Sequence, residues 1–123
     1  MVEIGGAVKK VVVGDRVVSS TYITCKECQY CRRGRETLCT NVKGRLGIDR
    51  DGGFAEYMKF PVSNLVKIPD EIPDEEAAIM SCGAGVPLHA LKSRGQISPL
   101  DTVMVLGVGG VGIHGVQVAK LLG

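Results

Sequence analysis

Four cysteines within a short segment are the part of this sequence that most directly implies chemistry. They follow the spacing C-x2-C-x2-C-x7-C and are Cys25, Cys28, Cys31 and Cys39. Three cysteines at two-residue intervals meet at one point only if the backbone coils tightly around it, and a fourth that returns from a short excursion completes a tetrahedron. Zinc binds four thiolates in this way in closed structural sites. The spacing therefore predicts a structural zinc site in the loop 25–39.

Three other interpretations of these cysteines remain open. They could be unrelated thiols or two disulfides, but nothing resembling a signal peptide precedes them, so we expect a reduced, cytoplasmic setting. They could also hold an iron–sulfur cluster for electron transfer. Bacterial cluster motifs usually close with C-x3-C-P, whereas seven residues precede Cys39 here and Thr40 follows it. A visible absorption spectrum separates the metals, because zinc is colourless.

The residues between the cysteines suit a metal loop. Gly34 lies where the chain must turn back, and glycine accepts a positive φ there. Four thiolates around one zinc ion leave a net charge of about −2, which nearby cations stabilise. The segment is rich in cationic residues, namely Lys26, Arg32, Arg33 and Arg35.

A glycine-rich loop is the second chemical feature. The pattern G-x-G-x-x-G spans residues 107–112, after an apolar run at 102–106 and before an amphipathic helical pattern. In this context the pattern indicates a dinucleotide site, in which glycines allow a tight turn and the helix amides face a pyrophosphate. The expected cofactor is NAD or NADP, and the candidate positions are Gly107, Gly109, Gly110, Val111 and Gly112. The acidic residue that would distinguish the two cofactors is expected beyond Gly123.

The first 70 residues are predicted to be rich in β-structure. Residues 7–13 and 16–19 flank the turn pair Gly14-Asp15 and are typical of a strand–turn–strand unit. Residues 54–60 partly alternate between apolar and polar, as in a half-buried strand, and 65–68 form a short strand stopped by a proline.

Helices are predicted after residue 73. An acidic first turn at 74–76 precedes a short helix, and a second helix at 86–94 ends at Gly95 as its C-cap. The run 102–106 is typical of a strand buried on both faces. One face of the last helix carries apolar and small residues, namely Val111, Gly115, Val118, Ala119 and Leu122.

Composition excludes several classes of function. The chain has 123 residues, a net charge of +2 and only one aromatic residue, Tyr30, in its basic loop, which argues against nucleic-acid binding. No apolar stretch reaches the roughly 20 residues that a membrane-spanning helix needs.

The combination of a four-cysteine loop and a downstream dinucleotide pattern resembles the zinc-containing medium-chain alcohol dehydrogenases. The resemblance covers nearly the whole chain. It includes the strand around Gly14-Asp15-Arg16-Val17, the cysteine loop with Gly34, the segments at 51–57 and 68–70, and the residues 107–112 and 116–120.

This resemblance implies an α/β fold: part of a GroES-like β-barrel with a structural zinc lobe at 25–39, then the first βα unit of a Rossmann domain. The expected domains are 1–82 and 83–123. The implied activity is hydride transfer between NAD(P) and a small alcohol or carbonyl compound in a longer homo-oligomeric enzyme. Cys82 corresponds to the third ligand of the family's catalytic zinc. The other two ligands are expected before Met1, so the chain contains no complete catalytic site and is expected to be inactive alone.

The chain has two histidines, His89 and His114. Both lie at polar positions of predicted helices, and we expect both at the surface. The remaining alternative function is an interaction module stapled by zinc, in which the glycine loop is incidental. Binding of NAD(H) by a longer chain would argue against that alternative.

Overall fold

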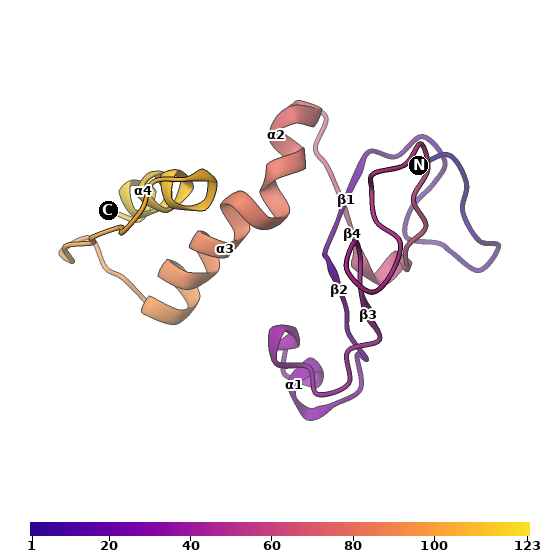
Figure 1. The fold of residues 1–123 in the computed structure, drawn as a ribbon, viewed down its shortest axis with the longest axis horizontal. Coiled ribbons are helices and arrows are strands. Elements are labelled where there is room, and N and C mark those ends of the chain that lie inside the picture. The colour runs from indigo at the N-terminus through magenta and orange to yellow at the C-terminus, as the bar shows by residue number, and fades with distance from the viewer. The chain divides into compact units, whose positions relative to one another are not determined.

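The computed structural model describes all residues from 1 to 123, and the chain forms two compact units, Met1–Pro69 and Asp70–Gly123. The first unit contains short strands and the cysteine loop, whereas the second contains helices joined by a loop and has no strand (Figure 1). None of the helices has both the length and the apolar character that crossing a membrane requires.

Two small antiparallel sheets form the frame of the first unit. Strand β1 (Val17–Ser19) pairs with β4 (Leu65–Lys67), with Val17 opposite Lys67. Strand β2 (Tyr22–Ile23) pairs with β3 (Gly44–Arg45). Each sheet has two strands of two or three residues, so the unit has fewer strands than the sequence predicts, and they do not close into a barrel.

The predicted pairing of residues 7–13 with 16–19 is wrong. The turn between them exists, since Gly14 has φ +94° and the Asp15 amide donates to the Val12 carbonyl at 3.2 Å. The segment 7–13 nevertheless forms no strand, and β1 pairs instead with β4, more than forty residues away. A β-branched run becomes a strand only where a partner offers its backbone groups, and here the distant partner supplies the ladder.

The strand predicted at 54–60 is also absent. This segment forms bends without ladder hydrogen bonds, and the side chains of Phe54 and Tyr57 are exposed. No other strand lies in register with the segment, so its partial alternation has nothing to pair with. The strand predicted at 65–68 is confirmed as β4.

A buried amide joins the two sheets of the first unit. Asn64 ends the 3₁₀-helix η2 (Val62–Asn64) just before β4, and its side chain is only 4% exposed. Its Nδ2 donates to the carbonyls of Ser20 at 2.9 Å and Tyr22 at 2.8 Å. These two bonds connect the start of β4 to the chain between β1 and β2, because buried carbonyls need donors.

The second unit begins with one continuous helical stretch over residues 74–95. It consists of α2 (Asp74–Ile79), the π-helical η3 (Met80–Ala84), α3 (Gly85–Leu88) and the π-helical η4 (His89–Gly95). Figure 1 draws α2 and α3 as turns of the same coil. The acidic first turn of α2 is confirmed, and its carboxylates interact favourably with the positive end of the helix dipole.

The helical stretch ends one residue later than the sequence indicates. Gly95 remains helical, and the left-handed cap residue is Gln96, with φ +50° and ψ +40°. A Cβ atom on Gly95 would lie 3.2 Å from the Ala90 carbonyl oxygen. Gly95 therefore serves close packing in the last turn rather than the cap, and that prediction is wrong.

The helix α4 (Gly110–Leu122) is confirmed, but the strand predicted before it is not. In the segment 102–106, Val103 and Val105 are half-buried, whereas Met104 and Leu106 are exposed. The segment forms no ladder with any other strand, and only one of its faces is covered. A strand is buried along its whole length only if other elements cover both of its faces. Within this chain α4 packs on one face of the segment 102–106.

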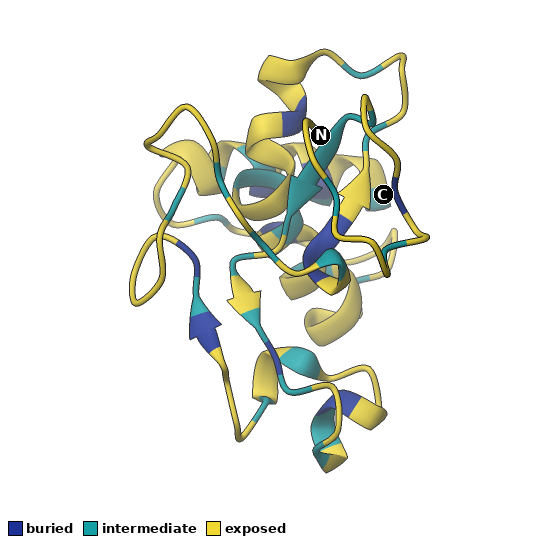
Figure 2. Cartoon of the chain, turned by 90° about the vertical axis from the view of Figure 1, so that its right-hand side faces the viewer, coloured by how far each residue is buried: buried dark blue, intermediate teal, exposed yellow.

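Burial is limited in both units. Figure 2 shows most of the chain in the colour for exposed residues, with short buried segments between. The buried apolar residues are Val11, Cys31, Leu46, Leu65, Ala77 and Val118. With so few buried apolar side chains, individual hydrogen bonds carry a large part of the stability.

We expect Asn64→Ala to lower the free energy of unfolding by about 1–3 kcal/mol, because it leaves the carbonyls of Ser20 and Tyr22 without their donor. Urea unfolding followed by circular dichroism measures the change. Asn41→Ala removes an exposed amide and serves as the control. Equal losses for the two variants would contradict the role assigned to Asn64.

Candidate metal centre and glycine loop

A short helical turn shapes the cysteine loop. α1 (Gln29–Arg32) is followed by Gly34 two residues later, and Gly34 has φ +70°, as the sequence predicts. The Gly34 amide donates to the Cys31 carbonyl at 3.0 Å, and the Arg35 amide donates to the Tyr30 carbonyl at 2.9 Å. These two bonds form a Schellman motif, which reverses the chain with a left-handed glycine. The reversal directs the chain into the 3₁₀-helix η1 (Glu36–Leu38) and on to the fourth cysteine.

The four cysteine sulfurs lie together. All four Sγ atoms are within 4.8 Å of one another. The Sγ of Cys25 is 3.5 Å from that of Cys39 and 3.9 Å from that of Cys31. A tetrahedron with zinc–sulfur bonds of about 2.3 Å has sulfurs about 3.8 Å apart, so the spacing fits a zinc ion. A disulfide needs about 2.05 Å, and all five cysteines are free.

Backbone amides point at the sulfurs. The Cys28 amide donates to the Cys25 sulfur at 3.3 Å, and the Cys31 amide donates to the Cys28 sulfur at 3.5 Å. The Cys25 amide donates to the Cys39 sulfur at 3.4 Å. Amide donors stabilise the thiolate form over the thiol, which is the form that binds a metal. The loop therefore supplies both the sulfur ligands and part of their charge compensation.

The thiols differ in acidity. The amides of Cys31 and Thr40 lower the pKa of Cys28 to about 5, and the amide of Cys25 lowers the pKa of Cys39. Burial raises the pKa of Cys31 to about 12. A bound divalent cation would favour the thiolate form of Cys31 against this effect of burial.

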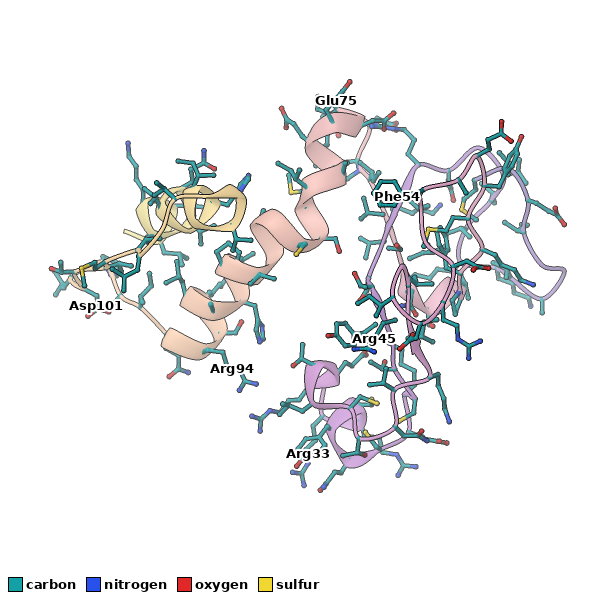
Figure 3. The ribbon with its side chains drawn as sticks, viewed as in Figure 1. Arg33, Arg45, Phe54, Glu75, Arg94 and Asp101 are labelled. Atoms are coloured by element: carbon teal, nitrogen blue, oxygen red, sulfur yellow. The ribbon has the colours of Figure 1, made fainter.

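One acidic residue of the loop is missing from the sequence-based site. Glu36 accepts a hydrogen bond from the Thr24 hydroxyl at 2.9 Å and forms an ion pair with Lys26. Lys26 therefore neutralises a carboxylate, instead of acting only as a cation beside the thiolates. Figure 3 shows the side chain of Arg33 directed outwards from this loop. The signal in the sequence was weak, since an isolated glutamate in a basic loop has many possible partners.

The glycine loop forms the turn that the sequence predicts. Gly107 has φ +88°, and Gly109 is extended with φ −69° and ψ −168° as the N-cap of α4. The Ile113 amide donates to the Gly109 carbonyl at 2.9 Å, so α4 begins within the pattern. A Cβ atom on Gly107, Gly109 or Gly110 would meet nothing within 4 Å. The first turn of α4 thus has an open side without side chains.

Two later glycines do the opposite and allow close packing. A Cβ atom on Gly112 would lie 1.9 Å from the Gly107 carbonyl oxygen, a distance that no side chain permits. Gly115 is buried, and a Cβ atom there would lie within 4 Å of Pro87 and Val105. Gly112 therefore lets the helix pass directly over the turn that precedes it.

Comparison with known proteins gives the family. Residues 1–70 match the family described as the alcohol dehydrogenase GroES-like domain. The chain belongs to the zinc-containing medium-chain alcohol dehydrogenases. The match covers the cysteine loop, and the resemblance drawn from the sequence is confirmed.

Individual relatives cover both units. The chain is 45% identical to an L-threonine 3-dehydrogenase of Rhizobium rhizogenes, over 98% of the chain and 34% of that protein. It is 42% identical to an acryloyl-coenzyme A reductase of Sulfurisphaera tokodaii, over 98% of the chain and 36% of that protein. A cobalt- and zinc-bound thermostable alcohol dehydrogenase from Pyrobaculum aerophilum matches 99% of the chain and 36% of its own, with a TM-score of 0.89 and 38% identity. The chain thus spans about a third of the length of these relatives.

Cys82 does not join the four-cysteine cluster. It is exposed in η3, and the cluster of four is the only group of three or more metal-ligating side chains in the chain. His89 is exposed, as expected. His114 is half-buried instead: its Nδ1 lies 2.5 Å from the Gly110 carbonyl oxygen, and a Cβ atom on Gly83 would lie 3.6 Å from its ring. The expectation that His114 lies at the surface is therefore wrong in part.

We expect Gly112→Ala to destabilise the second unit by about 1–3 kcal/mol, because the new methyl group collides with the Gly107 carbonyl oxygen. Thermal unfolding followed by far-ultraviolet circular dichroism measures the effect. Gly110→Ala is the matched control, since a Cβ atom there meets open space and alanine favours the helix. A larger loss for Gly110→Ala would contradict the packing described.

Proposed function

We propose that this chain is part of an NAD(P)-dependent zinc alcohol dehydrogenase, which transfers a hydride between a small alcohol or carbonyl compound and the nicotinamide. The observation that carries the proposal is the cluster of four sulfurs within 4.8 Å in a chain whose first 70 residues match the family's GroES-like domain. The substrate class follows the relatives, whose names include a threonine dehydrogenase and alcohol dehydrogenases. The longer enzyme is proposed to be a homo-oligomer.

The four cysteines, Cys25, Cys28, Cys31 and Cys39, would hold one structural zinc ion. Four protein sulfurs complete the coordination of zinc and leave no position for a substrate oxygen, so a closed site of this kind supplies folding energy rather than catalysis. The amide donors and the left-handed Gly34 preform the ligand arrangement. This chemistry favours a zinc ion that stabilises the loop over a zinc ion that takes part in a reaction.

The glycine loop is proposed to bind the pyrophosphate of NAD or NADP. Gly109 leaves room for close approach of a phosphate, and the first amides of α4 can donate to it. The positive φ of Gly107 and the close packing of Gly112 agree with the roles of glycines in a Rossmann βα turn. The candidate positions are Gly107, Gly109, Gly110, Val111 and Gly112.

The proposed domain division places 1–82 in the catalytic domain and 83–123 in the cofactor domain. The compact units of the structure divide at Pro69 instead, and the helical stretch 74–95 runs across the proposed boundary. The division thus concerns the longer enzyme and stays a prediction. Cys82 lies at this boundary and is proposed as one ligand of a catalytic zinc, whose other ligands this chain does not supply.

We expect the purified chain to bind one zinc ion, with zinc–sulfur distances of about 2.3 Å. Cys39→Ser should abolish this binding, because three thiolates leave the site incomplete, whereas Cys82→Ser should not change it. Elemental analysis and X-ray absorption at the zinc edge measure the stoichiometry and the distances. Visible absorption typical of iron–sulfur clusters, or disulfide-linked peptides from residues 25–39, would refute the proposed site.

We also expect the 123-residue chain alone to show no alcohol-dependent reduction of NAD or NADP. A catalytic zinc needs three protein ligands and an open position, and apart from the four-cysteine cluster no three metal-ligating side chains come together here. Absorbance at the nicotinamide band, recorded with a panel of small alcohols, tests this expectation. Turnover together with two bound zinc ions would show that the active site has been misplaced.

A further inference from the structure

The side chain of Glu36 touches the residues on both sides of the first cysteine. It accepts a hydrogen bond from the Thr24 hydroxyl at 2.9 Å and pairs with the Lys26 ammonium group. Its backbone carbonyl accepts the Cys39 amide at 3.0 Å. Glu36 therefore connects the segment that carries Cys25 with the turn that carries Cys39.

These two cysteines close the cluster. The sulfurs of Cys25 and Cys39 are 3.5 Å apart, and the Cys25 amide donates to the Cys39 sulfur. The two cysteines come from opposite ends of the loop, and α1, the Schellman motif and η1 lie between them. Cys28 and Cys31 are connected through α1, whereas Cys25 and Cys39 have no such short connection, so a bond across the two ends of the loop supports the pair that the chain itself connects least.

Burial makes the threonine contact costly to lose. Thr24 is only 7% exposed, and a buried hydroxyl without a partner destabilises the fold. Lys26 has φ +62°, a left-handed conformation that is unfavourable for residues other than glycine. Its ammonium group forms the ion pair with the Glu36 carboxylate. Both side chains are about two-fifths exposed, so the pair by itself adds little.

We propose that Glu36 and Thr24 are positioning residues of the metal centre, which hold the Cys25 and Cys39 sulfurs at bonding distance for the ion. The inference rests on the zinc site proposed above and extends it to residues that bind no metal themselves. Groups that orient metal ligands typically alter metal affinity by about 10- to 100-fold when removed.

If Glu36 acted only through its charge, its removal would slow zinc release, whereas a positioning role predicts faster release. A carboxylate near a cluster of net charge about −2 repels it, so removing that charge should slow metal loss. Positioning predicts faster loss. Thr24→Val separates the two explanations further, because it keeps the shape and charge of the side chain and removes only the hydroxyl.

The test measures zinc release from the zinc-loaded 123-residue chain into excess chromophoric chelator. We expect Thr24→Val and Glu36→Ala each to release zinc about 10-fold faster than the unaltered chain. The double variant should release zinc no faster than Glu36→Ala alone, because Glu36→Ala already removes the hydrogen bond of the Thr24 hydroxyl. Thr24→Ser, which restores a hydroxyl, should return the rate towards that of the unaltered chain. Thr37→Val, an exposed threonine on η1, is the matched control and should leave the rate unchanged.

Cobalt substitution adds a readout of ligand geometry. The unaltered chain loaded with Co²⁺ should show the intense visible bands of tetrahedral thiolate coordination, and Thr24→Val should weaken or shift them. Release at the unaltered rate with an unchanged cobalt spectrum in both single variants would overturn this inference while leaving the zinc site intact. An unaltered chain that binds no zinc would instead overturn the proposed site, and this inference with it.

Discussion

The meeting of four cysteine sulfurs is the constraint on which the order of the first unit most depends. Between Cys25 and Cys39 the loop buries one apolar side chain, Cys31, and its helical turns contain four and three residues. Helices this short are not stable by themselves. The loop therefore needs bonds that converge from several points of the chain, and a metal ion held by the four thiolates would supply them. With the proposed ion bound, folding of the loop and binding of the ion would be one equilibrium.

The second unit depends on glycine positions, where the residue has no side chain. Gly112 has no room for a Cβ atom, so the helix can cross the preceding turn, whereas Gly109 and Gly110 face open space. The same short pattern thus combines close backbone packing on one side with exposed amides on the other. Such a division would suit the proposed pyrophosphate site, because a phosphate group needs both a fixed helix N-terminus and free approach to it.

Expectations based on short stretches of sequence agreed best with the structure. The reversal at Gly34, the turn at Gly107 and the helix α4 depend on residues within a few positions of each other, and all three are present. The strands expected at 7–13, 54–60 and 102–106 are absent as ladders. A strand exists only with a partner, and the hydrophobic pattern of one segment does not identify that partner.

The sequence by itself determined the candidate metal ligands, the left-handed glycine that reverses their loop and the glycine pattern at the start of α4, because each follows from residue type and local spacing. Only the tertiary structure decided which distant groups support them. It paired β1 with β4, placed the Asn64 amide between two carbonyls and joined Glu36 to Thr24 across the metal loop. Such contacts depend on where separate segments meet, and buried polar groups select their partners only after the chain has brought those segments together.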